Sequence, residues 1–143
     1  RPSHLCSEPR VNVTVQVVCA PTEEEAKFIA TSRNLNRARR LLEAKTGQRI
    51  EGLSSPEEAS NTALSEEALQ YINQYTAGYY DGDPTQIAKA LHDVSESYET
   101  QDIGIVTIAY YLKDRIKSYE LIAHELGLTN KISPQLTTTQ LRD

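Results

Sequence analysis

The sequence predicts a helix-rich α/β protein with parallel strands, and three observations carry this prediction. The run 103–109 is apolar, rich in β-branched residues and free of charge, which is typical of a strand buried on both faces. Apolar residues then recur at spacings of three and four through 112–126, which indicates an amphipathic helix that stops at Gly127. The alternation of valine with polar residues over 11–18 predicts a second strand.

Helices are expected between these two strands, because helix-start signals recur there. Capping boxes are predicted at Thr22 with Glu25 and at Asp83 with Gln86. The predicted elements are a helix from 22 to a stop at Gly47, a start at Ser55, a helix over 65–75, a turn over 79–84 and a helix over 83–98.

Composition narrows the class of protein. A length of 143 residues favours one domain, and a net charge of −5 with a pI near 5.2 argues against a nucleic-acid or anionic-membrane surface. No apolar run approaches the roughly 20 residues needed to span a bilayer. The first ten residues do not resemble a signal peptide, and the two cysteines, Cys6 and Cys19, are expected to be reduced thiols in a cytoplasmic protein.

Two parallel strands are too few for an independent sheet. The run 103–109 is expected to have neighbouring strands on both sides, because it is apolar on both faces. The chain also begins with Arg1 and contains no methionine, so we expect it to be cut, processed or partly recorded. Either the helices carry a mostly α domain, or the sheet is completed by another polypeptide, and we expect the second.

Three segments resemble one known family. Residues 115–123, RIKSYELIA, follow the apolar run 103–109 and match a signature R-x-[RK]-S-Y-E-L-[LI]-A. Residues 15–26 resemble an apolar strand followed by A-x-T-x-E-E-A, and 82–87 resemble a V-G-[ST]-P-E-x-V turn in which Asp83 replaces the usual Ser or Thr. In this order and spacing the segments resemble the C-terminal portion of the bacterial luciferase-like flavin-dependent monooxygenases.

This resemblance implies a fold and a chemistry. The fold would be the C-terminal part of a (β/α)8 TIM barrel, namely the last two β/α units plus inserted helices, with 1–143 as a single segment and 128–143 as a loose tail. The activity would be oxidation of a small organic substrate with O2 and FMN, or with a deazaflavin. The chain alone is expected to be inactive and to bind flavin weakly or not at all, and its partner would be the N-terminal portion of the same barrel, as a companion chain or another copy.

Candidate cofactor-binding residues are Cys19, Tyr110 and Tyr111, because they follow the two predicted strands and barrel sites lie at the carboxyl ends of strands. A thiol that closes an apolar strand is more often a small buried hydrophobe, and aromatic residues at a strand end are more often rim packing. No catalytic residue is predicted, since the family's catalytic residues lie upstream. No pair of His or Cys has metal-ligand spacing, so no metal site is expected.

Two further predictions concern a basic patch on the first helix and alternative functions of the chain. The first helix carries arginines that are suited to a phosphate or, more commonly, to a solvated ion-pair surface: Arg33, Arg37, Arg39 and Arg40. Instead of an enzyme part, the chain could be a non-catalytic assembly or oligomerisation module that pairs its strand edges. A third reading, a small helical regulatory domain, requires 103–109 to be helical.

Overall fold

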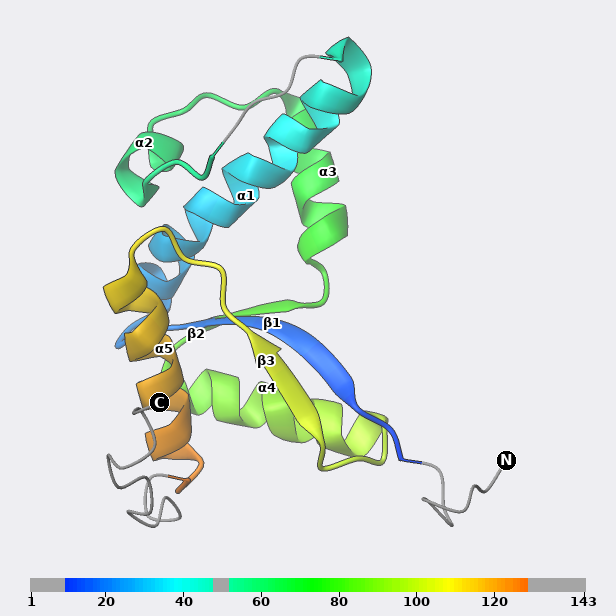
Figure 1. Ribbon diagram of the computed structural model, residues 1–143, viewed down its shortest axis with the longest axis vertical. Helices are drawn as coiled ribbons and strands as arrows, with labels where there is room; N and C mark the ends of the chain where they lie inside the picture. The colour runs from blue at the N-terminus through cyan, green and yellow to red at the C-terminus, as the bar shows by residue number, and fades with distance from the viewer. Residues whose placement is uncertain (1–9, 48–51, 129–143) are drawn as a thin grey trace, which may run out of the picture.

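Strands and helices alternate along the chain in the computed structural model, which describes residues 10–47 and 52–128 (Figure 1). The strands are β1 (Val13–Cys19), β2 (Tyr79–Gly82) and β3 (Ile103–Val106). The helices are α1 (Glu23–Thr46), α2 (Pro56–Ser60), α3 (Glu66–Thr76), α4 (Pro84–Ser97) and α5 (Leu112–Glu125). None of the helices in these ranges has the length and apolar character that a membrane crossing requires.

The three strands form one parallel sheet in the order β2-β1-β3, with β1 in the centre. The carboxyl half of β1 pairs with β2, so that Gln16 lies beside Tyr79. The amino half pairs with β3, so that Val13 lies beside Ile103. The edges of β2 and β3 that face away from β1 have no strand partner within the described residues.

This strand order corrects the predicted fold. In a (β/α)8 barrel each strand pairs with the next strand along the chain, and the sheet closes on itself. Here β2 and β3 do not pair with each other, since both flank β1, and the sheet is open. The prediction of a C-terminal part of a TIM barrel is therefore wrong, and the chain forms a small α/β domain with a three-stranded parallel sheet.

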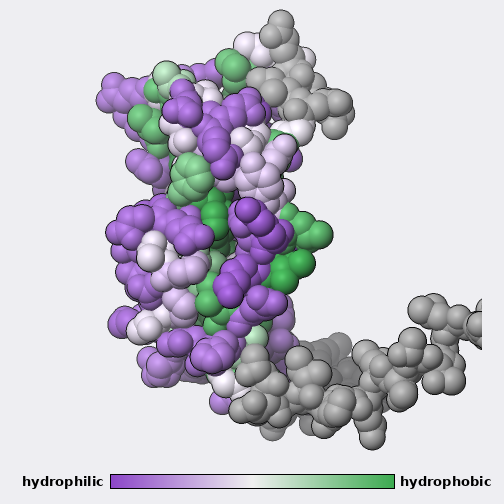
Figure 2. Space-filling view, turned by 90° about the vertical axis from the view of Figure 1, so that its left-hand side faces the viewer, coloured by the Kyte–Doolittle hydropathy of each residue, from purple (hydrophilic) through white to green (hydrophobic). Residues whose placement is uncertain are grey.

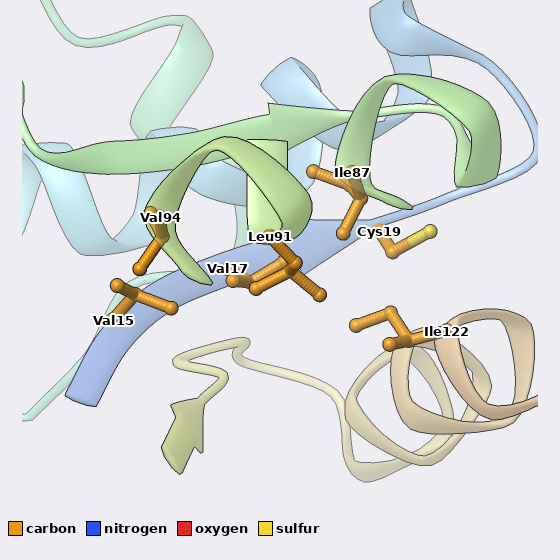
Figure 3. Packing of buried hydrophobic residues seen from close by; sticks show 7 residues of the cluster. All are labelled: Val15, Val17, Cys19, Ile87, Leu91, Val94 and Ile122. Carbon is orange, nitrogen blue, oxygen red and sulfur yellow. The ribbon is translucent and has the colours of Figure 1, made fainter. Parts of the chain in front are cut away.

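Two helical layers cover opposite faces of β1, because its side chains alternate between the faces. Val15, Val17 and Cys19 point to one face, where they pack against α4 and α5. Figure 3 shows these side chains meeting the following residues of the two helices: Ile87, Leu91, Val94 and Ile122. On the other face, Val18 and Ala20 pack against the first turns of α1. Each fully buried valine of this kind stabilises the fold by about 1.5–3 kcal/mol.

Strand β2 was not predicted, because 79–82 was interpreted as part of a turn. Its four residues, Tyr-Tyr-Asp-Gly, have neither apolar alternation nor a β-branched residue. The predicted strand 103–109 is confirmed only as far as Val106, and β3 is an edge strand rather than one with neighbours on both sides. Because 103–106 is a strand, the reading of the chain as a helical regulatory domain is wrong.

The predicted helix starts are confirmed. The side chains of Thr22 and Ser55 each accept a hydrogen bond from the backbone N–H three residues on. At Thr22 this is one half of the predicted capping box, and the return bond from the Glu25 side chain is not formed. Asp83 and Gln86 form a complete capping box, in which each side chain accepts from the other residue's N–H. Gly82 leaves room for this box, because a Cβ there would lie 2.6 Å from Gln86 Oε1 and would force the Gln86 side chain to move. The predicted loose tail falls almost entirely outside the described residues.

The basic patch predicted on the first helix is not one solvated face. Arg33 is 1% exposed and forms a bidentate ion pair with Asp81 of β2, with Nη2 2.7 Å and Nη1 3.0 Å from the two carboxylate oxygens. Its guanidinium also lies 4.7 Å from the ring centroid of Tyr79. This pair holds α1 against the edge strand β2.

The remaining arginines of that patch contact other elements or solvent. Arg37 donates to the hydroxyl of Tyr79 over 2.9 Å, Arg39 lies 3.6 Å from a carboxylate oxygen of Glu58, and Arg40 is exposed. An anion would therefore have to displace existing partners of these side chains, and the patch does not form a free phosphate site.

We expect Asp81→Ala to lower the free energy of unfolding by about 3 kcal/mol, because it leaves a buried guanidinium without its counter-charge. Asp93→Ala is the control, since it removes a carboxylate from the exposed Lys89–Asp93 pair and is expected to cost less than about 1 kcal/mol. Urea denaturation measures both. Equal costs for the two variants would show that the Arg33–Asp81 pair does not hold β2 in place.

Candidate functional site

The carboxyl edge of the sheet between β1 and β3 is the candidate site. The connection after β1 enters α1 on one face, and the connection after β3 enters α5 on the other face. Figure 1 shows both helices beginning at this edge. In doubly wound proteins, ligands bind where connections diverge in this way. Topology therefore singles out this edge.

A hydrogen-bond network, buried at Ser118 and partly exposed at Tyr119, holds the two strand ends to α5. Ser118 Oγ accepts from the backbone N–H of Cys19 at 2.9 Å, and it lies 3.5 Å from Thr107 Oγ1. The hydroxyl of Tyr119 accepts from the backbone N–H of Thr107 at 3.1 Å and lies 3.5 Å from the carbonyl oxygen of Ile105. Ser118 is fully buried, so its hydroxyl satisfies a backbone donor that water cannot reach.

The periodicity of the sequence predicted Tyr119 as part of the apolar stripe of this helix and predicted no role for Ser118. The structure gives both a positioning role, since they fix where β1 and β3 end relative to α5. The available signal was a serine and a tyrosine adjacent on a helix that otherwise presents apolar and charged side chains.

Replacing Ser118 with alanine is expected to lower the free energy of unfolding by about 1–3 kcal/mol, because it leaves the buried N–H of Cys19 without an acceptor. Ser97→Ala removes an exposed hydroxyl from α4 and is expected to change stability by no more than about 0.5 kcal/mol. Chemical denaturation of both variants gives the comparison. If Ser118→Ala lowered the free energy of unfolding no more than Ser97→Ala does, the hydrogen bonds of Ser118 would not be what fixes this edge.

Tyr110 and Tyr111 lie at this edge, as their place after the predicted strand implied. Their rings meet edge to face, with centroids 4.9 Å apart and planes at 90°. Tyr110 is 46% exposed, whereas Tyr111 is half-buried. The preceding Ala109 packs against the cluster around Val18 and Ala20, which brings this segment beside the end of β1. Their binding of a cofactor stays a prediction.

Tyr111 connects this edge to α2. Its hydroxyl lies 3.3 Å from Glu57 Oε2, and the ammonium of Lys113 lies 5.2 Å from the centroid of its ring. Desolvation, followed by the negative charge of Glu57, raises the pKa of Tyr111 above its ordinary value. The pKa of Glu57 is lowered, first by its own backbone N–H and also by the Ser55 and Tyr111 side chains. Tyr111 is therefore a neutral hydrogen-bond donor at physiological pH.

Cys19 reaches the same edge through its backbone, while its side chain lies in the core. The side chain is 1% exposed and packs between α4 and α5 (Figure 3). Burial, helped by the charges of Asp83 and Glu125, raises the pKa of the thiol to about 11. A flavin could meet this thiol only if the core opened, so the expected contact between Cys19 and a cofactor stays a prediction.

The buried thiol is expected to react slowly with iodoacetamide at pH 8. A pKa of about 11 instead of 9.0 lowers the thiolate fraction about 100-fold, so Cys19 should label at least that much more slowly in the folded protein than in urea. Peptide mapping by mass spectrometry separates Cys19 from Cys6, which lies outside the described residues. Rapid labelling of Cys19 in buffer would contradict its place in the core.

The raised pKa of the Cys19 thiol also makes the free energy of unfolding fall at alkaline pH. Because its pKa is higher in the folded state, its contribution is fully present below pH 9 and is lost as pH rises towards 11. Cys19→Val is expected to reduce this part of the decline in unfolding free energy between pH 9 and 11. Tyrosines and lysines titrate in the same range, so the difference between the two proteins is the measured quantity.

Two apolar hollows lie away from this edge, along α1. One hollow has a volume of about 320 Å³ and lies between the second half of α1 and the start of α3. Its lining includes Leu35, Leu42 and Leu64. The other, of about 360 Å³, continues past Leu35 towards Ile72 of α3. Neither hollow is lined by Cys19, Tyr110 or Tyr111, so neither belongs to the candidate site.

Comparison with known sequences gives relatives of unassigned function. No family model matches the chain. The chain is 31% identical over 122 residues to the uncharacterized protein YwcH of Bacillus subtilis (strain 168), a match that covers 85% of the chain and 35% of YwcH. It is 30% identical over 125 residues to the uncharacterized protein YceB of the same organism, covering 86% of the chain and 36% of YceB. The chain thus spans about a third of the length of these relatives.

Comparison with solved structures supports the fold. The crystal structure of apo-MsnO8 matches with a TM-score of 0.73 over 90% of the chain and 38% of MsnO8, at 21% identity. At this identity the likeness concerns the fold alone. The chain is thus an α/β protein with a three-stranded parallel sheet, similar in fold to part of MsnO8 and in sequence to part of YwcH and YceB.

Proposed function

We propose that the chain contributes a flavin-contacting edge to an FMN-dependent, luciferase-like oxidoreductase that oxidises a small organic substrate with O2. The observation that carries this proposal is the position of Tyr110 and Tyr111 at the point where the connections after β1 and β3 diverge. The resemblance of three sequence segments to luciferase-like monooxygenases supports it. The cofactor of that family is FMN or a deazaflavin, and we propose FMN for this chain.

The residues at this edge fit such a cofactor. The ring of Tyr110 is exposed and can lie against a planar ring system. No side chain caps the first turn of α5, so the backbone N–H groups that precede Asp114 can donate to a phosphate, and Lys113 is one of these residues. The N–H of Asp114 already donates to the carbonyl oxygen of Tyr111. The neutral hydroxyl of Tyr111 can donate a hydrogen bond. Cys19 supplies the backbone that Ser118 fixes, rather than an exposed thiol.

A bound reduced flavin would supply the electrons that activate O2. The chain's own part would be to orient the ring with Tyr110, to hold the phosphate at the start of α5 and to keep the edge rigid through Ser118 and Tyr119. No residue of the chain is assigned a proton transfer. Because the chain spans about a third of YwcH and YceB, the whole activity, its substrate and its partners belong to this proposal.

We place the protein in the cytoplasm, which the free thiol of Cys19 supports. A companion polypeptide is the proposed partner for catalysis. The unpaired edges of β2 and β3 can each accept a further strand, and this would enclose the flavin more fully than the present chain does.

The proposal is tested by adding FMN at millimolar concentration to the isotopically labelled chain and recording backbone amide shifts by NMR. We expect weak binding, with shifts concentrated in Ala20 and in 107–113. Tyr110→Ala is expected to weaken binding about threefold to tenfold, because an aromatic pair contributes about 0.5–1.5 kcal/mol beyond its buried area.

Tyr98→Ala is the control, since Tyr98 is also exposed but lies at the end of α4. It is expected to leave the FMN affinity unchanged. Shifts confined to the hollows along α1, or an absence of shifts at 107–113, would remove the basis for the proposal.

The alternative is a non-catalytic assembly module. It is favoured by the two unpaired strand edges and by apolar side chains that reach solvent between Val106 and Leu128. An assembly role predicts self-association without any effect of FMN, whereas the flavin proposal predicts the localised amide shifts.

A further inference from the structure

The outer edge of β3, which faces away from β1, contains no charged residue and no proline. Soluble proteins commonly protect such an edge with charged side chains or proline, because unpaired backbone groups invite pairing with another chain. The run 103–109 is also apolar and rich in β-branched residues, which is the composition of segments that add to strands of other copies. Apolar surface reaches solvent at mid-height on the side of the molecule where α5 lies (Figure 2). The edge of β3 therefore needs protection from another element.

The backbone groups of alternate residues in this segment face the outer edge. The carbonyl oxygen of Asp102 accepts from the N–H of Val13, so the groups of even-numbered residues face β1. Successive residues of a strand direct their N–H and C=O groups to opposite edges. The groups on the outer edge therefore belong to the odd-numbered residues: Ile103, Ile105 and Thr107.

The hydroxyl of Tyr119 on α5 lies against two of these outward groups. It accepts from the N–H of Thr107 at 3.1 Å and lies 3.5 Å from the carbonyl oxygen of Ile105, to which it donates. A phenolic hydroxyl can accept and donate at the same time. One residue of a parallel strand paired with Val106 would bond to the same two groups. The hydroxyl thus takes the place of that residue.

We propose that Tyr119 caps the outer edge of β3 and blocks the addition of a strand beyond Ile105. The amino half of this edge stays open, because the carbonyl oxygen of Ile103 and the N–H of Ile105 have no hydrogen-bond partner within the described residues. A companion strand of the kind proposed above can therefore pair beside Gly104 but no farther along β3. The cap itself does not depend on flavin binding.

Amide hydrogen exchange, followed by NMR, tests whether the cap forms. In the unchanged chain, Thr107 is expected to exchange more slowly than Ile105, whose N–H also faces outward but has no acceptor. Tyr119→Phe removes the hydroxyl and keeps the ring, and it is expected to speed exchange at Thr107 about threefold to tenfold, because one net hydrogen bond is lost. Exchange at the amides of β1 is expected to stay the same. Exchange at Thr107 that Tyr119→Phe does not speed overturns the proposal.

Self-association, followed by thioflavin T fluorescence, tests whether the cap blocks strand addition. Tyr119→Phe is expected to associate at least about threefold faster than the unchanged chain, because its edge is uncovered. Ser118→Ala is the matched control, since it is expected to lower the free energy of unfolding at least as much but keeps the hydroxyl of Tyr119. Association of Tyr119→Phe that is no faster than that of Ser118→Ala overturns the proposal.

A charge placed on the edge strand tests whether strand pairing causes this association. Val106 is 41% exposed, so Val106→Lys adds a charge to β3 at an exposed position. Combined with Tyr119→Phe, it is expected to return the rate to within about twofold of the unchanged chain, because a lysine on an edge strand opposes pairing. Leu69→Lys, at a position on α3 that is 48% exposed, makes the same change in net charge and is expected to leave Tyr119→Phe fast. Equal rates for the two double variants overturn the proposal.

Discussion

The structure depends on the burial of β1, which is covered on both faces at its carboxyl end, and on its pairing along both edges. A strand in this position needs two helical layers and two neighbouring strands at once, and the chain supplies each from a different segment. The valines of one face require α4 and α5, whereas Val18 requires the first turns of α1. The divergence of the connections at the carboxyl edge follows from this constraint, because helices that serve opposite faces must leave the sheet in opposite directions.

The candidate site is rigid because α5, which covers one face of the sheet, is also bonded to the ends of β1 and β3. Ser118 and Tyr119 lie on α5 but bond to the backbone of β1 and β3, so the helix and the two strand ends form one unit. The tyrosine pair emerges from this unit, with Tyr111 tied to α2 through Glu57. An edge fixed by hydrogen bonds from the side chains of α5 is a suitable frame for a ligand, since binding there need not order the backbone first.

Local signals in the sequence predicted the helices and β1 correctly, because caps and periodicity act within a few residues. The pairing of strands could not be predicted, since β2 has no periodicity and its place beside β1 is set by contacts with α1. The burial of Arg33 was missed for the same reason: its partner, Asp81, is 48 residues away. Tyr110 and Tyr111 could be placed at the edge, but the network of Ser118 could not, because it joins residues 99 apart.

The strand order also has a consequence for synthesis on the ribosome. Of the three described strands the central one is made before the other two, which follow about 60 and 90 residues later. Pairing between such distant strands is slow, because the entropy of closing a long loop is lost before any contact between the strands stabilises them. During translation β1 therefore exposes its row of valines and two bare edges, and a nascent chain in this state is exposed to aggregation or to capture by a chaperone.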